Sequence, residues 1–166
     1  MIARDLDDGE SIMLAQEMHA DLSAQFAGRW GNARASSLSP APTMLRAAAL
    51  HDTHFRETEA DLPIAVAAGR PYSHREAPFS QAHLDALAAN VQWVGARDAY
   101  AGLLVSMHHT GLAQNRYGVI NSWHNDYGAS IRKREMRAEV AQLVGALEQD
   151  QAHTRRKLVE AGLASD

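Results

Sequence analysis

Apolar residues recur every three or four positions along most of the chain, which is the spacing that places side chains on one face of an α-helix. The first such stripe contains Met18, Leu22 and Phe26, and we expect it to face the protein core. Other stripes of this kind follow at intervals separated by Pro- or Gly-containing segments. The pattern predicts helices over residues 16 to about 28, 43–55, 80–94, 97–109 and 131–161.

One of these segments is apolar on every side. From Ala99 to Met107 the only polar residue is Ser106, which is typical of a helix that is buried in the middle of a bundle. We expect this helix to end near Gly111, because glycine often follows the last turn of a helix.

The chain opens differently. Two short apolar runs flank an Asp-Gly turn at Gly9, which predicts a small β-hairpin over residues 1–14. Residues 57–79 contain three prolines and Gly69, so we expect an irregular excursion there. The predicted fold is therefore an all-α bundle of about five helices with a small N-terminal β-hairpin. It forms one domain over residues 1–166, with the hairpin at 1–14, the site-bearing helices at 15–112 and a C-terminal helical segment at 129–162.

Composition excludes several kinds of protein. None of the 166 residues is cysteine, so disulfide scaffolds, thiolate zinc sites and cysteine nucleophiles are ruled out. The net charge of -4 gives no support to nucleic-acid binding. The longest nearly uncharged stretch, Ala99 to Leu112, is shorter than the roughly 20 residues that cross a bilayer, and the charged N-terminus does not resemble a signal peptide. We expect a soluble, cytoplasmic protein.

Histidines at inward-facing helical positions are the candidate chemistry. His19 lies on the first predicted helix, His51 on the second and His108 near the end of the apolar one. Asp52 follows His51 in a segment that is otherwise apolar except for Arg46. A carboxylate in such surroundings must be paired or bound to metal, because a bare buried charge is costly. Imidazole and carboxylate together suit Fe, Mn, Zn or Ni.

Each histidine taken alone is also compatible with a satisfied core or capping residue. Their convergence from three helices favours a metal site, because buried titratable groups are costly unless they are used. His109 points about 100° away from His108 on a helix, so only one of the two should be a ligand. We expect that ligand to be His108, with His109 at the rim or in contact with substrate. The other candidates for loop or surface positions are His74, His124 and His153.

The order of these histidine and aspartate residues along the chain is similar to that of a known group of proteins. A histidine, an adjacent His-Asp pair about thirty residues later and a further histidine resemble the HD-domain superfamily of helical metalloproteins. The chain is more closely similar to an uncharacterised bacterial domain-of-unknown-function family (DUF3891-like). The stretches that carry this similarity are the opening hairpin, residues 16–23 (QEMHADLS), His51-Asp52, residues 61–63 (DLP) and residues 100–108 (YAGLLVSMH).

The HD resemblance implies one metal ion held by His19, His51 and Asp52, with the carboxylate bridging to a second ion held by two further histidines. His108 and His83 are the implied ligands of that second ion. Asp126 or Glu135 is the implied remaining carboxylate. This chain departs from the family after Asp52, where Thr53-His54-Phe55 replaces the usual Gly-Trp, and His54 becomes an additional candidate ligand.

The irregular excursion adds candidate catalytic groups. Asp61 could serve as a general base or orient a ligand histidine, and Arg70 could hold an anionic substrate through paired hydrogen bonds. A loop salt bridge is the alternative for each residue.

These residues predict an HD-type metal-dependent enzyme with one or two divalent ions (Fe, Mn or Zn). We expect a hydrolase that acts on a phosphorylated small molecule. One alternative is a non-haem diiron oxygenase, because nitrogen and oxygen ligands suit iron equally well. Another is a metal-stabilised structural or binding module, whose ligand sphere would be closed. The sequence leaves the substrate and the oligomeric state open.

Overall fold

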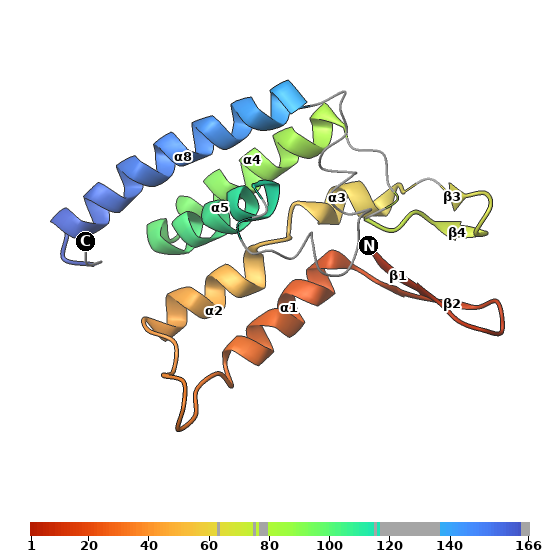
Figure 1. Ribbon diagram of the computed structural model, residues 1–166, viewed down its shortest axis with the longest axis horizontal. Coiled ribbons are helices and arrows are strands. Elements are labelled where there is room, and N and C mark those ends of the chain that lie inside the picture. Colours follow the sequence, from red (N-terminus) through yellow and green to blue (C-terminus); the bar gives the residue numbers. More distant parts are fainter. Residues whose placement is uncertain (63, 75, 77–79, 115, 117–136, 164–166) are drawn as a thin grey trace.

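The structure is a computed structural model that describes residues 1–62, 64–74, 76, 80–114, 116 and 137–163 (Figure 1). It is mainly helical, with two small antiparallel hairpins, which confirms the predicted fold class. The elements are β1 (Ile2–Asp5), β2 (Ser11–Leu14), α1 (Gln16–Ala27), α2 (Ala41–Leu50), α3 (Phe55–Ala60), β3 (Ile64–Ala65), β4 (Arg70–Pro71), α4 (Gln81–Gly95), α5 (Ala99–Ala113) and α8 (Arg137–Glu160).

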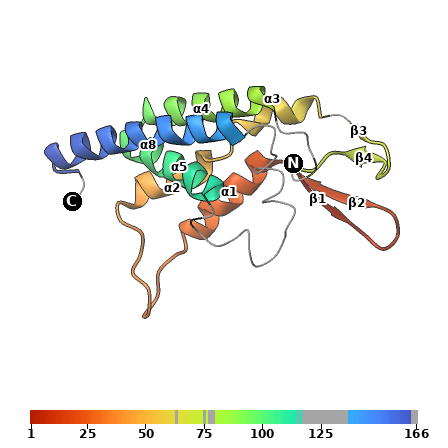
Figure 2. The same cartoon turned by 45° about the horizontal axis from the view of Figure 1, so that its top comes forward.

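The helices form a bundle in which each packs on a defined neighbour. α1 packs on α2, α2 on α5, and α5 on both α4 and α8. Figure 2 shows α8 lying along α4 and α5. The core between α2, α4 and α5 consists of small and branched apolar side chains that include Ala47, Val94, Ala101 and Val105. Among the described residues, no helix combines the length and the apolar character needed to cross a membrane.

The predicted N-terminal hairpin is present. β1 and β2 pair from Ile2 opposite Leu14 to Asp5 opposite Ser11, and Gly9 takes the positive φ that the turn requires. A second hairpin, β3 with β4, lies within the stretch that was expected to be irregular. Both hairpins project from the same end of the molecule (Figure 1). Short strands of this kind give little periodic signal in the sequence.

α5 is buried as its apolar sequence predicts, and it ends at Ala113, two residues past the expected end at Gly111. The end of the helix packs against α8, where the side chain of Gln151 donates hydrogen bonds to the hydroxyls of Ser106 and Thr110. Thr110 is fully buried in this contact. Tertiary contacts thus hold the last turn in place through a glycine that would otherwise favour its end.

The apolar stripe of α1 faces the opposite way from our expectation. Met18, Leu22 and Phe26 are exposed by 59%, 43% and 68%, so the prediction that they face the core is wrong. α1 instead packs on α2 through a face of small residues, on which Ala20 is fully buried and Ala24 partly so. Small side chains allow two helices to approach closely, although they contribute little to a hydrophobic stripe.

The last helix is described from Arg137 onward, and its predicted start at residue 131 lies outside the described residues. It ends at Glu160, within one residue of the prediction. The apolar side chains of Val140, Leu143, Val144 and Leu147 lie on one face of this helix and are partly or fully buried.

α4 and α5 approach most closely at two glycines. A Cβ atom added to Gly102 would clash with Cα of Gly95 and lie 2.7 Å from its backbone nitrogen. A Cβ added to Gly95 would meet nothing nearer than 3.9 Å, which is ordinary contact. The two positions therefore differ in tolerance even though they face each other.

We expect Gly102→Ala to lower the free energy of unfolding by about 1 to 3 kcal/mol, because the added methyl group forces α4 and α5 apart. Gly95→Ala is the matched control and should be neutral or stabilising, since alanine favours the helix over glycine. Urea unfolding of both variants measures the difference. Equal stability of the two would contradict this account of the contact.

Candidate metal centre

The His51-Asp52 pair lies at a break between two helices. The sequence predicted one helix over residues 43–55, but α2 ends at Leu50, and four turn residues precede α3. The break is held from outside by the buried side chain of Asn90 on α4. Its amide nitrogen donates to the carbonyl oxygens of Leu50 and His51 (3.1 Å each), and its amide oxygen accepts from the hydroxyl of Thr53 (2.6 Å).

Asn90 is a supporting residue that sequence reasoning missed. A signal was present, because Asn90 shares a helix face with Leu87 and Val94, where a polar side chain needs a partner. The same face carries His83 at its start. The partners of Asn90 are backbone carbonyls some forty residues away, and periodicity within one helix does not reveal them.

The ring of His51 is oriented by the backbone. Its Nδ1 lies 2.8 Å from the carbonyl oxygen of Ala48, and because a carbonyl can only accept, Nδ1 carries the proton. Its Nε2 lies 3.2 Å from Oδ2 of Asp52. A neutral ring with this tautomer directs a lone pair at a carboxylate, which is favourable only with a proton or a cation between them. Metal-ligating histidines are usually held through the other ring nitrogen in this way.

Three side chains converge here from two parts of the chain. His19 of α1 contacts the ring of His51, with the ring centroids 5.5 Å apart. Potential ligand atoms of His19, His51 and Asp52 all lie within 4.8 Å of one another. Two ligands of one ion are about 3 to 4 Å apart when each bond is about 2.0 to 2.2 Å long, so small side-chain rotations would complete such a site.

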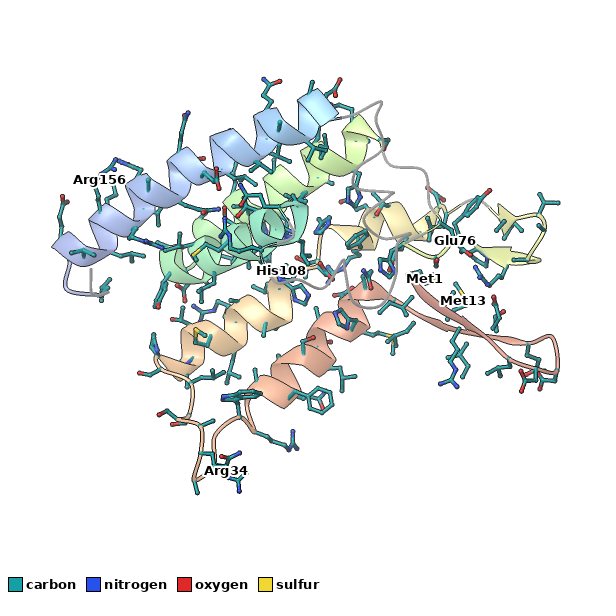
Figure 3. All side chains as sticks on the ribbon, in the orientation of Figure 1. Met1, Met13, Arg34, Glu76, His108 and Arg156 are labelled. Carbon is teal, nitrogen blue, oxygen red and sulfur yellow. The ribbon has the colours of Figure 1, made fainter. Side chains whose placement is uncertain are left out.

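His108 stands beside this group. Its ring centroid is 4.9 Å from that of His51. Figure 3 shows it near the centre of the molecule, where α5 passes the end of α2. Its role as a ligand stays a prediction, because it lies next to the three-residue group without being part of it.

A second group shares Asp52. Potential ligand atoms of Asp52, His54 and His109 also lie within 4.8 Å of one another, and all three residues are buried. The expectation that His109 lies at the rim is wrong, because only 8% of it is exposed and its Nε2 lies 3.1 Å from the carbonyl oxygen of His51. His109 faces inward as well as His108, because residues of the 51–54 turn lie against both rings: His51 beside His108, and the His51 carbonyl and the His54 ring beside His109.

Burial sets the protonation of these rings. It lowers the pKa of His54 and of His108 to about 4, and it lowers the pKa of His109 and His83 as well. Burial opposes protonation of His51 too, yet the hydrogen bond and charge of Asp52 outweigh it and raise the pKa of His51. The rings of these four residues (His54, His83, His108 and His109) are therefore neutral at pH 7, which is the form that binds metal.

Asp52 is ionised despite its surroundings. Burial alone would raise the pKa of this carboxyl group, but the hydrogen bond and charge of His51, with smaller contributions from His109 and His54, lower it to about 2. The centre thus combines one buried carboxylate with several neutral imidazoles.

The other predicted site residues occupy different positions. His83 on α4 lies against the ring of His54, with centroids 5.5 Å apart, and its role as a ligand stays a prediction. Asp61 follows α3 and is exposed. Asp126 and Glu135, the candidates for a further carboxylate ligand, lie outside the described residues, as does His124.

Arg70 is engaged in two ion pairs with carboxylates outside the histidine groups. Its guanidinium contacts the carboxylates of Asp5 (2.6 Å) and Glu76 (2.7 Å), and so ties β4 to β1. This is the loop salt bridge that the sequence left as an alternative. Catalytic roles for Arg70 and Asp61 stay predictions.

The two other histidines that were predicted to lie in loops or on the surface, His74 and His153, differ in exposure. His153 is exposed on α8. His74 is in a loop, but it is half-buried and its ring contacts the carbonyl oxygen of Met1.

Comparison with known proteins identifies one family. The sequence pattern of the family described as "Protein of unknown function (DUF3891)" matches residues 1–163. No curated protein and no solved structure matches the chain.

Proposed function

The chain belongs to this DUF3891 family of proteins of unknown function, and from the geometry of its histidine centre we propose that it is a metal-dependent hydrolase acting on a phosphorylated small molecule. The HD-type ligand order of His19, His51 and Asp52 is part of the proposal. The observation that carries it is the convergence of these three buried or half-buried side chains, whose potential ligand atoms lie within 4.8 Å of one another.

A metal ion fits the residues better than a purely structural role does. Both ring nitrogens of His54 are buried without a hydrogen-bond partner, although a neutral imidazole has one donor and one acceptor to satisfy. The lone pair of His51 faces the carboxylate of Asp52. The first feature is costly in a metal-free core and is resolved by a bound cation. The second is satisfied by a proton or by a cation between the two groups.

The donor set narrows the choice of ion. The ligands are imidazole nitrogens and a carboxylate, and the chain has no cysteine, which suits Fe, Mn or Zn. Such an ion, when bound, supplies Lewis acidity toward phosphoryl oxygens and lowers the pKa of a coordinated water. His51 and His109 would keep fixed orientations through their bonds to backbone carbonyls, so the chain itself pre-organises the shell.

Charge favours an anionic substrate. The described part of the site has a single carboxylate, Asp52, and burial keeps the rings of His54 and His108 neutral at pH 7. This leaves much of the charge of a divalent ion uncompensated, and phosphate oxygens would complete the balance. A diiron oxygenase remains the second candidate, because the same nitrogen and oxygen donors suit iron.

The test is phosphate release by metal-reconstituted protein. The chain is stripped with a chelator, reloaded separately with Mn²⁺, Zn²⁺ or Fe²⁺, and given a panel of nucleotides and sugar phosphates. We expect release of inorganic phosphate that depends on the metal, and a loss of at least about 100-fold in His19→Ala, because a missing ligand weakens both binding and orientation.

The exposed His153→Ala variant is the control and should retain activity. Oxygen uptake by the Fe²⁺-loaded protein without phosphate release would replace the hydrolase by the oxygenase. Bound metal with neither activity would instead identify a structural site.

A further inference from the structure

The group formed by Asp52, His54 and His109 is not needed to hold one ion at His19 and His51. It uses two other histidines, and only Asp52 is common to both groups. The three residues are 7%, 9% and 8% exposed, so they form the driest part of the centre. The hydrogen bonds of the two histidines in this group indicate which ring nitrogens are free to bind a ligand.

His54 is the residue whose environment is least satisfied. Neither ring nitrogen has a hydrogen-bond partner, and the ring lies against Phe55, with centroids 4.2 Å apart. An unpaired buried polar group costs about 1 to 3 kcal/mol. The ring of His54 packs against Phe55 while its two nitrogens have no partner in the protein, and this arrangement favours a bound ligand as their partner.

His109 has one nitrogen committed and one available. Its Nε2 donates to the carbonyl oxygen of His51, which leaves Nδ1 with the lone pair. His51 shows the same arrangement in the other group, where Nδ1 donates to a backbone carbonyl. Each group therefore contains one imidazole that is oriented through its second nitrogen, as metal-binding histidines usually are.

We propose that Asp52, His54 and His109 form a second divalent-metal site, and that Asp52 bridges it to the site of His19 and His51. A carboxylate has two oxygens, so it can bind two ions and offset the repulsion between them. Ions paired in this way lie about 3.5 to 4 Å apart. This inference rests on the proposed function, because it assumes that His19, His51 and Asp52 hold a metal ion. It differs from the ligands that family resemblance implied, which were His83 and His108.

The experiment measures how many Co²⁺ ions the protein binds. Chelator-treated protein is titrated with Co²⁺, freed of excess metal and analysed for cobalt per chain, and visible absorption follows the filling of each site. We expect two equivalents in the wild type and one in His54→Phe. Phenylalanine keeps an aromatic ring against Phe55 and lacks both nitrogens, with a ring one atom larger than imidazole.

Three further variants separate this site from its neighbours. His153→Ala is the exposed control and should bind two equivalents. His83→Phe should also bind two, and His19→Ala should bind one. Loss of an equivalent in His83→Phe with none lost in His54→Phe would overturn the proposed ligands.

The two proposals fail in different ways. If the wild type binds one Co²⁺ that His19→Ala abolishes and His54→Phe retains, the second site is overturned while the proposed function stands. If the wild type binds no Co²⁺, both are overturned. Because His54→Phe removes unpaired nitrogens, the metal-free variant should melt no lower than the metal-free wild type, and a variant that fails to fold would contradict the proposal.

Discussion

Replacing Asp52 by asparagine is expected to remove nearly all bound divalent metal while the helical content stays near that of the wild type. Asp52 is the one residue common to both ligand groups. A neutral amide supplies no charge to offset that of an ion and is a poor bridge between two. We expect the affinity for Co²⁺ to fall by more than about 100-fold, because changing a residue that only orients a ligand already costs 10- to 100-fold.

The fold should survive this change. The side chains of asparagine and aspartate have the same shape, and the asparagine amide can still donate to Nε2 of His51, which lies 3.2 Å from Oδ2 in the wild type. The matched control is Asp85→Asn, which removes an exposed carboxylate from α4 and should leave metal content unchanged. Metal analysis with circular dichroism gives the result, and full occupancy in Asp52→Asn would contradict the site.

Acidification is expected to destabilise the metal-free protein between pH 6.5 and about 4. Burial lowers the pKa of His54 and His108 to about 4 in the folded chain, whereas the unfolded chain has ordinary histidines near 6.5. The unfolded state therefore binds more protons in this range, so stability falls as the pH falls. At pH 5 each such group costs about 2 kcal/mol.

One residue acts in the opposite direction. Burial lowers the pKa of His51, but the hydrogen bond and charge of Asp52 outweigh burial and raise it. Protonation of His51 therefore offsets part of the stability that is lost as the pH falls. Urea unfolding in the presence of a chelator at pH 7.5 and pH 5 measures the balance. His54→Phe should lose about 2 kcal/mol less than the wild type over this interval. Stability that is constant or rises toward pH 5 would contradict the burial of neutral rings.

Much of the helical framework was predictable because it depends on local periodicity. The hairpin of residues 2–14 was recognisable from its Asp-Gly turn, and α4 begins within one residue of its prediction at the N-cap Ser80. The burial of α5 followed from a segment in which Ser106 was the only polar residue counted. In each case neighbouring residues carry the information.

The predictions that were wrong depended on distant contacts. α2 ends at Leu50 rather than at Phe55, because the side chain of Asn90 on α4 satisfies the carbonyls exposed at that end. The buried face of α1 is made of small residues whose value lies in close approach to α2. In each case the partner belongs to another helix, so the sequence of the helix itself does not reveal it.

The candidate metal centre also has features that the sequence predicts and features that depend on tertiary contacts. The sequence by itself determined the donor types, imidazole and carboxylate without thiolate, and it identified His19, His51 and Asp52 as candidates. Only the tertiary structure decided that His54 and His109 share Asp52 and that Arg70 is taken up by two carboxylates. The physical reason is that the direction of a ring depends on where a helix breaks and how it is rotated, and at this site contacts from α4 and α5 decide both.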